Sequence, residues 1–337
     1  MNKKIFVKAM IGTYLMTTTG LASAAPIGDT VSISGDYQVE GRVIHDRINT
    51  NDPTQPKYNS SFFHQTVRVN ITAKIDDDTT FFTRFSNDKN TGSNARSYED
   101  GTSEFDWYGV KGKFNNWKYS LGRQAVTLGK GAIINTGYSA NGIQLMFDGA
   151  ILSRPIGTAN IQVIGGKTTG PATNYNYPSK EWYGFDVTNQ FSDTIQGGVA
   201  FANCTTDQRR YYALNANVKL SPRFNLSGEF VRSSADTLNQ GYFVAGTYAL
   251  NQDTNFTVQY NHVERNSADT IVSGISAWGY PFYGNGLISG DSYSGLTYAY
   301  GKALNKNLSF HAVYLDLKSK GFSGRDREFA TGLTWSF

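Results

Sequence analysis

The chain ends in EFATGLTWSF (residues 328–337), a stretch in which apolar and polar side chains alternate. Counting back from the end, the odd positions hold Phe337, Trp335, Leu333, Thr331 and Phe329, whereas the even positions hold small or polar residues. A period of two is typical of a β-strand with one apolar and one polar face. Such a strand packs on a protein core or faces lipid, and the rest of the chain decides between the two.

The same alternation occurs near the beginning of the chain. In residues 31–43 and residues 63–75, apolar side chains at most odd positions alternate with polar side chains at the even positions. Strands of soluble proteins most often have about five or six residues, whereas a tilted strand that crosses a membrane needs roughly nine to eleven. These two stretches therefore favour membrane-spanning strands.

Segments of turn-forming residues separate the strands, and short and long segments alternate. The short ones are residues 76–78, 115–116, 154–158, 192–194, 221–223, 251–254 and 305–307. The longer polar ones are residues 45–60, 87–103, 125–141, 168–180, 203–210, 233–240, 266–290 and 318–327. This order predicts an all-β fold, a transmembrane antiparallel β-barrel of about 16 strands with short periplasmic turns and long extracellular loops.

The first 24 residues have the features of a cleaved secretory signal. Three lysines precede an uncharged stretch and the small residues Ala22-Ser23-Ala24. Without these lysines the Lys and Arg count falls from 31 to 28, against 27 Asp and Glu, so nucleic-acid binding has no support. The sequence therefore predicts a signal peptide over residues 1–24 and a single barrel domain over residues 25–337.

Composition also favours a barrel over a soluble domain or a helical membrane protein. The chain has 21 Phe, 21 Tyr and 5 Trp, yet its mean hydropathy is −0.41, as expected when apolar residues form one outward layer. No stretch after the signal segment has eighteen consecutive apolar residues, which excludes a helical membrane protein. The lone Cys204 excludes a disulfide framework.

A barrel of this width leaves an aqueous channel, and the residues that line the channel decide what crosses. Alternation places these charged residues inside: Arg68 and Arg84 at mid-height, Arg42 nearer the extracellular rim, and Asp148, Asp186 and Glu229 on later strands. The arginines and carboxylates either face each other and create a transverse field, or pair locally. In the second case Asp36 or Glu40 neutralises Arg68 on the neighbouring strand.

The stretch YSLGRQAVTLGKGAIINTGYSANGIQLMFDG (residues 119–149) resembles bacterial outer-membrane porins at LGRQ (residues 121–124). The resemblance implies that the third long loop folds inward and constricts the channel, that Arg123 lines the narrow zone, and that the protein is a homotrimer. Residues 125–141 contain no Asp or Glu and one charge, Lys130. Strict alternation places Arg123 on the lipid face, so an inward position requires a bulge near Gly122.

If the loop narrows the channel, four cations should outweigh the three inward carboxylates. These cations are Arg68, Arg84, Arg123 and Lys130. The sequence therefore predicts a weak anion preference.

The terminal strand has two predicted roles. Its apolar face meets lipid, with Trp335 and Phe337 in the aromatic girdle at the periplasmic interface. A terminal aromatic residue after alternating apolar residues also resembles the signal by which the outer-membrane assembly machinery recognises barrels.

Other classes of function have less support. The four histidines belong to no GxSxG or HExxH spacing, so no catalytic residue, metal site or cofactor is predicted, although His64 could join an Asp or Ser in a spatial triad. Trp107 and Trp182 either point inward as platforms for sugar rings or lie in interfacial girdles, which we favour. The uncharged segment SAWGYPFYGNGLISG (residues 276–290) could cover the mouth, contact a neighbouring subunit or bind a ligand.

The sequence therefore predicts a porin in the outer membrane of a diderm bacterium, surrounded by lipid, through which small hydrophilic solutes and ions diffuse passively. A substrate-selective channel, for example for sugars, is the alternative, followed by an outer-membrane enzyme or a surface receptor.

Overall fold

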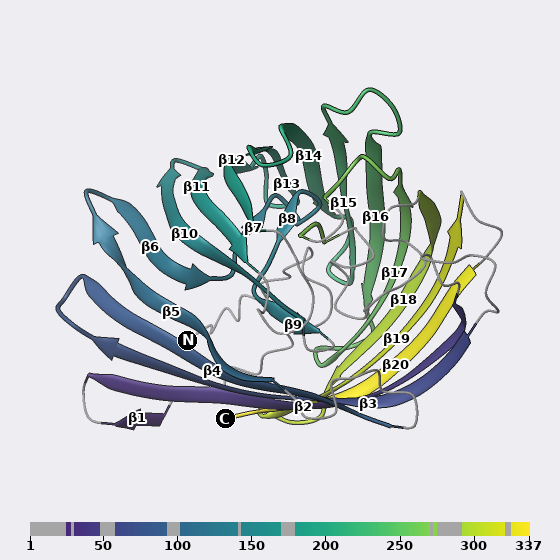
Figure 1. Cartoon of the computed structure of the whole chain (residues 1–337), viewed down its shortest axis with the longest axis horizontal. Helices are drawn as coiled ribbons and strands as arrows, with labels where there is room; N and C mark the ends of the chain where they lie inside the picture. The colour runs from purple at the N-terminus through teal and green to yellow at the C-terminus, as the bar shows by residue number, and fades with distance from the viewer. Residues whose placement is uncertain are drawn as a thin grey trace.

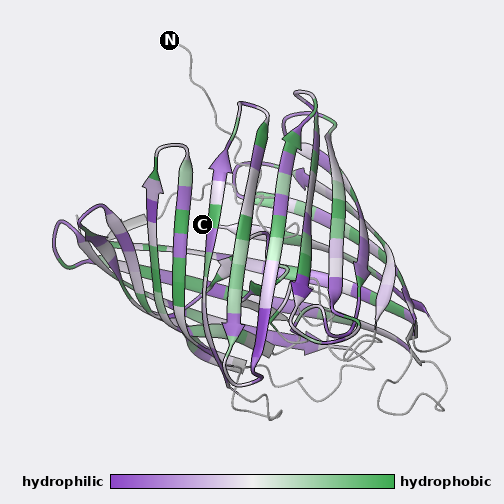
Figure 2. Ribbon diagram, turned by 90° about the horizontal axis from the view of Figure 1, so that it is seen from above, coloured by the Kyte–Doolittle hydropathy of each residue, from purple (hydrophilic) through white to green (hydrophobic). Residues whose placement is uncertain are grey.

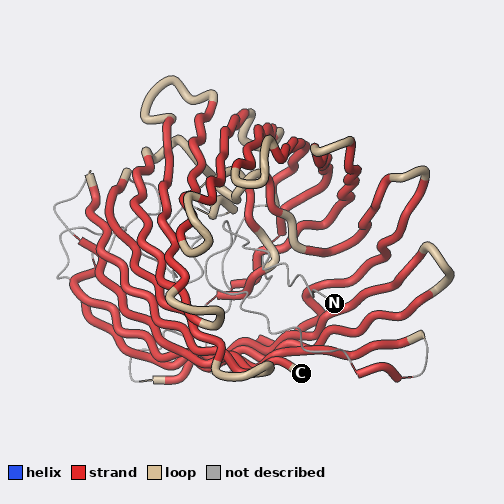
Figure 3. Tube along the Cα trace, turned by 180° about the vertical axis from the view of Figure 1, so that it is seen from behind, coloured by secondary structure: helices blue, strands red, loops and turns tan. Residues whose placement is uncertain are grey.

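The computed structural model describes residues 25–27, 30–47, 58–92, 102–140, 143–169, 179–269, 272–274, 292–320 and 325–337. In these ranges the chain consists of strands and their connections (Figure 3). None of these residues forms a helix that is long and apolar enough to cross a membrane. The predicted signal peptide and the segment of residues 276–290 lie outside the described residues.

Sixteen strands of the described chain form a closed antiparallel barrel (Figure 1). The first five are β2 (Val31–Arg47), β3 (Tyr58–Lys74), β4 (Thr79–Thr91), β5 (Thr102–Phe114) and β6 (Trp117–Gln124). The others are β10 (Ile143–Ile156), β11 (Ala159–Thr169), β12 (Lys180–Gln190), β13 (Ile195–Cys204), β14 (Arg209–Lys219), β15 (Phe224–Ser233), β16 (Gln240–Ala249), β17 (Thr254–Val263), β18 (Tyr293–Ala303), β19 (Leu308–Ser319) and β20 (Arg325–Ser336).

Four short strands of the described residues accompany the barrel. They are β1 (Ala25–Ile27), β7 (Thr127–Leu128), β8 (Ile134–Asn135) and β9 (Tyr138–Ala140). β1 pairs with β2, β9 pairs with β10, and β7 pairs with β8 in a separate two-stranded sheet.

Each barrel strand pairs with its neighbours along the chain, β6 pairs directly with β10, and β2 closes the ring on β20. The strand bounds confirm the seven short turns and seven of the eight longer connections that the sequence predicts. The connection between β13 and β14, residues 205–208, was expected to be longer but is no longer than the turn of residues 220–223. Local chemistry explains individual turns. Asn115 and Asn116 take positive φ angles of 46° and 66°, which Asn tolerates in tight hairpins. Asp76 accepts the amides of Asp78 and Thr79 at 2.9 and 2.8 Å, and these hydrogen bonds lower the pKa of its carboxyl group.

Apolar side chains face outward along the barrel wall. Figure 2 shows hydrophobic and hydrophilic residues following one another along the strands. On β13 to β15 the outward side chains of Val199, Leu214 and Phe230 are exposed, whereas neighbours such as Ala200 and Val231 are buried against the interior. The outer surface is therefore apolar over a wide band.

The terminal strand has the predicted orientation in the barrel. Trp335 lies opposite Tyr37 and Leu333 opposite Val39 in the ladder with β2. Phe337 exchanges two backbone hydrogen bonds of 3.0 Å with Gly35. A Cβ at residue 35 would lie 2.6 Å from the Phe337 ring and would overlap the Arg68 carbonyl, so the close approach of β20 requires glycine there.

Candidate functional site

The third long loop folds into the barrel, and we call its described part, residues 125–140, the inner loop. It leaves β6 after Gln124, forms the β7–β8 hairpin inside the ring of strands (Figure 1), and returns to the wall at β10. Val126, Leu128 and residues 132–134 are at most 2% exposed, and they belong to one apolar cluster with inward residues of β10 to β20. Burial of these side chains holds the inner loop against one side of the wall.

Two carboxylates from the wall bind the tip of the inner loop. Asp186 on β12 accepts the Gly129 amide at 3.0 Å, and Glu229 on β15 accepts the amides of Lys130 and Ala132 at 2.9 and 2.8 Å. Gly129 has a φ of 63°, and a Cβ on it would overlap Glu229 Oε1. Both acids face inward as predicted. They bind backbone amides, however, and hydrogen bonds to charged acceptors are among the stronger ones in proteins.

Lys130 sits in this tip and is half-buried. Burial lowers the pKa of its ammonium group, and the nearby Glu229 carboxylate opposes that shift. The single charge of the inner loop therefore lies beside an acid of the wall.

A second connection supports the inner loop from the end of the barrel that carries the long connections. The segment that follows β17 folds inward, with Ser267, Ala268 and Asp269 buried. Val272 accepts the Asn135 amide at 2.7 Å, and the Gly274 amide donates to the Gly131 carbonyl at 2.7 Å. The inner loop is thus bonded on one side to the wall and on the other to this segment.

The inner faces of β2 to β5 hold arginines that pair with acids of neighbouring strands. Arg68 donates two hydrogen bonds to Asp36 Oδ2, at 2.6 and 3.0 Å, and one to Oδ1 at 3.1 Å. Arg84 binds both oxygens of Asp106, at 2.8 and 2.5 Å, and donates to the Gly137 carbonyl of the inner loop at 3.3 Å. Local pairing, one of the two arrangements considered from the sequence, therefore describes these arginines.

A bulge that the alternation did not predict places Asp106 inside the barrel. Arg84 lies opposite Trp107 and Phe85 opposite Phe105, so Asp106 is one extra residue in the ladder between β4 and β5. The guanidinium of Arg84 lies 3.7 Å from the centre of the Trp107 ring. The sequence does carry a signal for this bulge, because the outward apolar residues Phe105 and Tyr108 are three positions apart rather than two.

A chain of bonded charges lies nearer the end of the barrel that carries the long connections. Glu40 binds both Arg42 on its own strand and His311 on β19, the latter at 2.7 Å. His311 reaches across β20 at Gly332, where a Cβ would lie 2.8 Å from the imidazole. Arg42 approaches His64 Nδ1 at 3.5 Å, and His64 Nε2 binds Asp88. Arg42 is therefore inward, as predicted, but it is paired.

The geometry at His64 does not suit a catalytic triad. The acid Asp88 and the hydroxyl of Thr66, at 3.4 Å, lie at the same ring nitrogen, Nε2. A triad needs the acid on one nitrogen and the nucleophile on the other, and here Arg42 occupies the second. In the described ranges no group of three His, Cys, Asp or Glu residues is arranged to hold a metal ion.

Comparison of the whole chain with solved structures identifies this architecture. One variant of the Rh. blastica porin aligns with a TM-score of 0.57 and 10% identity, over 91% of this chain and 100% of the other. A triple mutant of the Rhodopseudomonas blastica porin aligns with a TM-score of 0.56 and 11% identity, over the same shares of the two chains. The fold is that of a bacterial porin. No protein-family model and no curated protein matches the sequence.

Two residues expected inside this porin fold lie on its outer face. The ladders around Gly122 are regular, without the bulge predicted there, and Arg123 stands opposite the exposed Tyr108 and opposite Asp148. Arg123 binds Asp148 at 2.7 and 2.8 Å. Asp148 also stands opposite the exposed Lys167 of β11. The inward assignments of Arg123 and Asp148 are therefore wrong.

The two tryptophans also differ from the favoured interpretation. Trp182 is 2% exposed, donates from its indole nitrogen to Thr168 at 3.1 Å, and packs against Tyr211 inside the porin fold. Trp107 points inward beside Arg84. Neither lies in an interfacial girdle. Trp182 is also too buried to offer a stacking surface to a passing sugar.

Proposed function

We propose that this chain is an outer-membrane porin, which forms a water-filled channel for passive diffusion of small hydrophilic solutes and ions in a diderm bacterium. The observation that carries the proposal is the closed sixteen-stranded barrel with a loop bonded inside it and an apolar outer surface. A barrel of this width is not filled by its own inward side chains. A loop held inside by Asp186 and Glu229 narrows such a channel without closing it.

Conductance in a planar bilayer tests the channel directly. Purified protein should give stepwise, ohmic openings in KCl, and sugar uptake into liposomes should rise linearly with sugar concentration. A protein that folds and inserts but leaves the bilayer silent would contradict the proposal. Saturating sugar uptake would instead favour the substrate-selective alternative.

We assign no catalytic step to the protein. The histidine that could have taken part in a triad, His64, uses its two ring nitrogens for Arg42 and Asp88. Its side chain is 1% exposed, which is unsuited to a substrate.

We further propose that the chain assembles as a homotrimer. Ion pairs on the outer face support a protein contact, because charged side chains are costly in contact with lipid. These pairs, Arg123–Asp148 and Lys167–Glu181, lie on β6 and β10 to β12. The outward residues in the middle of β13 to β16, such as Leu214 and Val244, are apolar. A detergent-corrected mass of three chains is expected from light scattering, and a mass of one chain would contradict it.

Residues 1–24 and the terminal strand complete the proposal for export and assembly. We propose that residues 1–24 are cleaved on secretion and that Trp335 and Phe337 present the signal for the outer-membrane assembly machinery. Both side chains are exposed on the outer face of β20, at 58% and 46%. Deletion of residues 335–337 should leave a secreted chain that is absent from the outer membrane, with Arg210→Gln as an inserted control. Normal amounts of inserted barrel would contradict this role.

A further inference from the structure

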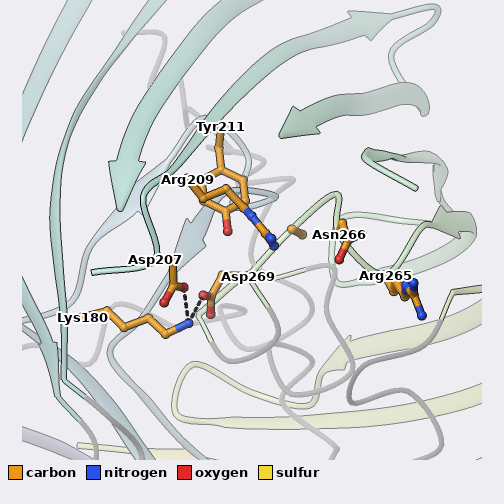
Figure 4. Close-up of a pocket in the computed structure, with 8 residues that line it drawn as sticks. Lys180, Asp207, Arg209, Tyr211, Arg265, Asn266 and Asp269 are labelled. Atoms are coloured by element: carbon orange, nitrogen blue, oxygen red, sulfur yellow. Dashed lines mark hydrogen bonds and ion pairs between the residues drawn. The ribbon is translucent and has the colours of Figure 1, made fainter. Parts of the chain in front are cut away.

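A pocket of about 170 Å³ opens on the inner side of the barrel, at the end that carries the long connections. Its lining comes from the first residue of β12, from the turn between β13 and β14 with the start of β14, and from residues 265–269 after β17 (Figure 4). Tyr211, which is 1% exposed, forms part of the lining. Tyr211 and Ala268 also belong to the apolar cluster that holds the inner loop, so the pocket lies beside that cluster.

One lysine fixes the walls of this pocket relative to each other. The ammonium of Lys180 lies 2.6 Å from Asp207 Oδ2 and 2.7 Å from Asp269 Oδ2, so it joins β12, the turn before β14 and the segment after β17 (Figure 4). Asp269 is 3% exposed, and it also accepts the Val272 amide at 3.0 Å. A site whose walls are already bonded loses little freedom when a ligand enters.

Two further cations line the pocket without an acid of their own. Arg209 lies opposite the buried Cys204 and so shares its inward face, and Arg265 belongs to the segment after β17. Among the described residues neither guanidinium forms a hydrogen bond or an ion pair. The inward arginines Arg68 and Arg84, in contrast, each bind a carboxylate.

The charged and polar residues of the pocket determine which class of ligand fits it. Three cations and two acids line the pocket, so its net charge is +1, and Arg209 and Arg265 supply the guanidinium groups that form no ion pair with either acid. A guanidinium presents planar paired donors that match a carboxylate or a phosphate. A cavity of roughly 150 Å³ accommodates a six-membered ring. Tyr211 and Asn266 add polar atoms near the hydroxyls of such a ring.

We propose that this pocket is a binding site for a ring-sized, hydroxylated oxyanion, such as a sugar phosphate or a sugar acid, on its way into the channel. The proposal rests on the proposed porin function, because the pocket faces the inside of the barrel at its mouth. It adds a binding step for one class of solute to a channel that otherwise passes solutes by diffusion.

Channel recordings test the site separately from the channel. Stepwise openings in KCl are recorded first, and their absence would count against the porin function alone. Glucose 6-phosphate or glucuronate is then added on the side of the long connections, with glucose as the neutral control. We expect a saturable, reversible reduction of the current with either acid and none with glucose. Open channels that respond to neither acid, or that respond equally to glucose, would overturn the proposal.

Substitutions of the two arginines test whether the acids block the current by binding in this pocket. Arg209→Gln and Arg265→Gln should each weaken the apparent affinity for the blocking acid by about tenfold, as expected for loss of a charge-assisted hydrogen bond. Conductance in KCl alone shows that each variant has folded. The matched control is Arg210→Gln, since Arg210 is the next residue on β14, is exposed and does not line the pocket. Unchanged block in both variants, or an equal loss in the control, would overturn the assignment of the site.

Discussion

Two sides of the inner wall use acidic side chains in different ways. On β2 to β5, the paired wall, Asp36 and Asp106 bind the arginines Arg68 and Arg84. On β12 to β15, the loop-bearing wall, Asp186 and Glu229 bind backbone amides of the inner loop. The inward neighbours there are apolar, because the inner loop packs on them. The contribution of an inward carboxylate to the electric field in the channel therefore depends on the group to which that carboxylate is bound.

The largest effect is expected at a buried ion pair of the paired wall. In the pair of Arg84 and Asp106 the side chains are 5% and 1% exposed. Arg84→Ala should lower the free energy of unfolding by about 3–5 kcal/mol, because it leaves a buried carboxylate without a partner. Denaturant unfolding of the refolded barrel measures this loss.

The double variant Arg84→Ala with Asp106→Ala serves as the control for that measurement. Removing both charges should restore most of the loss, since no unpaired charge remains. Equal instability of the single and double variants would show that packing on Trp107, rather than the ion pair, holds this wall.

The second-largest effect is expected from a substitution in the loop-bearing wall. Glu229→Ala leaves the amides of Lys130 and Ala132 without their acceptor, at a cost of about 1–3 kcal/mol for each buried donor. The inner loop should then leave the wall more often, so single-channel current should become noisier. Glu104→Ala removes an acid of β5 that, in the described ranges, forms no hydrogen bond, and it should change neither property. Quiet, unchanged channels in Glu229→Ala would contradict the anchoring role.

The sequence predicted the barrel well because the decisive signals are local. Alternation and turn-forming residues act within a few positions, so the strand count and the turns around Asn115 and Asn116 are confirmed. The inward positions of Arg68 and Glu229 also follow from unbroken alternation.

The predicted side-chain orientations are wrong where a distant part of the chain or a bulge changes which face of a strand points inward. On β10 the apolar residue Phe147 is 0% exposed and faces inward, because the inner loop supplies apolar partners there, and Asp148 consequently faces outward. The rule that apolar side chains face lipid does not hold behind such a loop. Asp106 was missed for a different reason, since one bulged residue reverses the faces of β5.

Two glycines with similar backbone conformations have different surroundings. Gly129 and Gly157 have φ angles of 63° and 58°, so alanine at either position costs about 1 kcal/mol or more in backbone strain. Only at Gly129 would the new Cβ overlap Glu229; nothing lies within 4 Å at Gly157. Gly129→Ala should therefore be less stable than Gly157→Ala by a further 1–3 kcal/mol or so, the usual cost of overpacking. Equal unfolding midpoints would show that the tip has room to move away from the wall.

The smallest effect concerns ion selectivity. The predicted anion preference counted four cations, but Arg123 lies outside the channel and Arg68 and Arg84 are paired. The Arg68–Asp36 pair is 16% and 18% exposed, so salt in the channel screens it over a Debye length of about 10 Å.

Arg68→Ala should therefore shift the reversal potential in a KCl gradient toward cation preference, because it uncovers Asp36. Arg68→Ala combined with Asp36→Ala removes the pair as a whole and should return the potential close to that of the unmodified protein. A transverse field built by unpartnered arginines makes the opposite prediction, because the double variant would then still lack the positive charge that selects anions. A double variant that stays as cation-preferring as Arg68→Ala would therefore show that Asp36 does not neutralise Arg68 in the open channel.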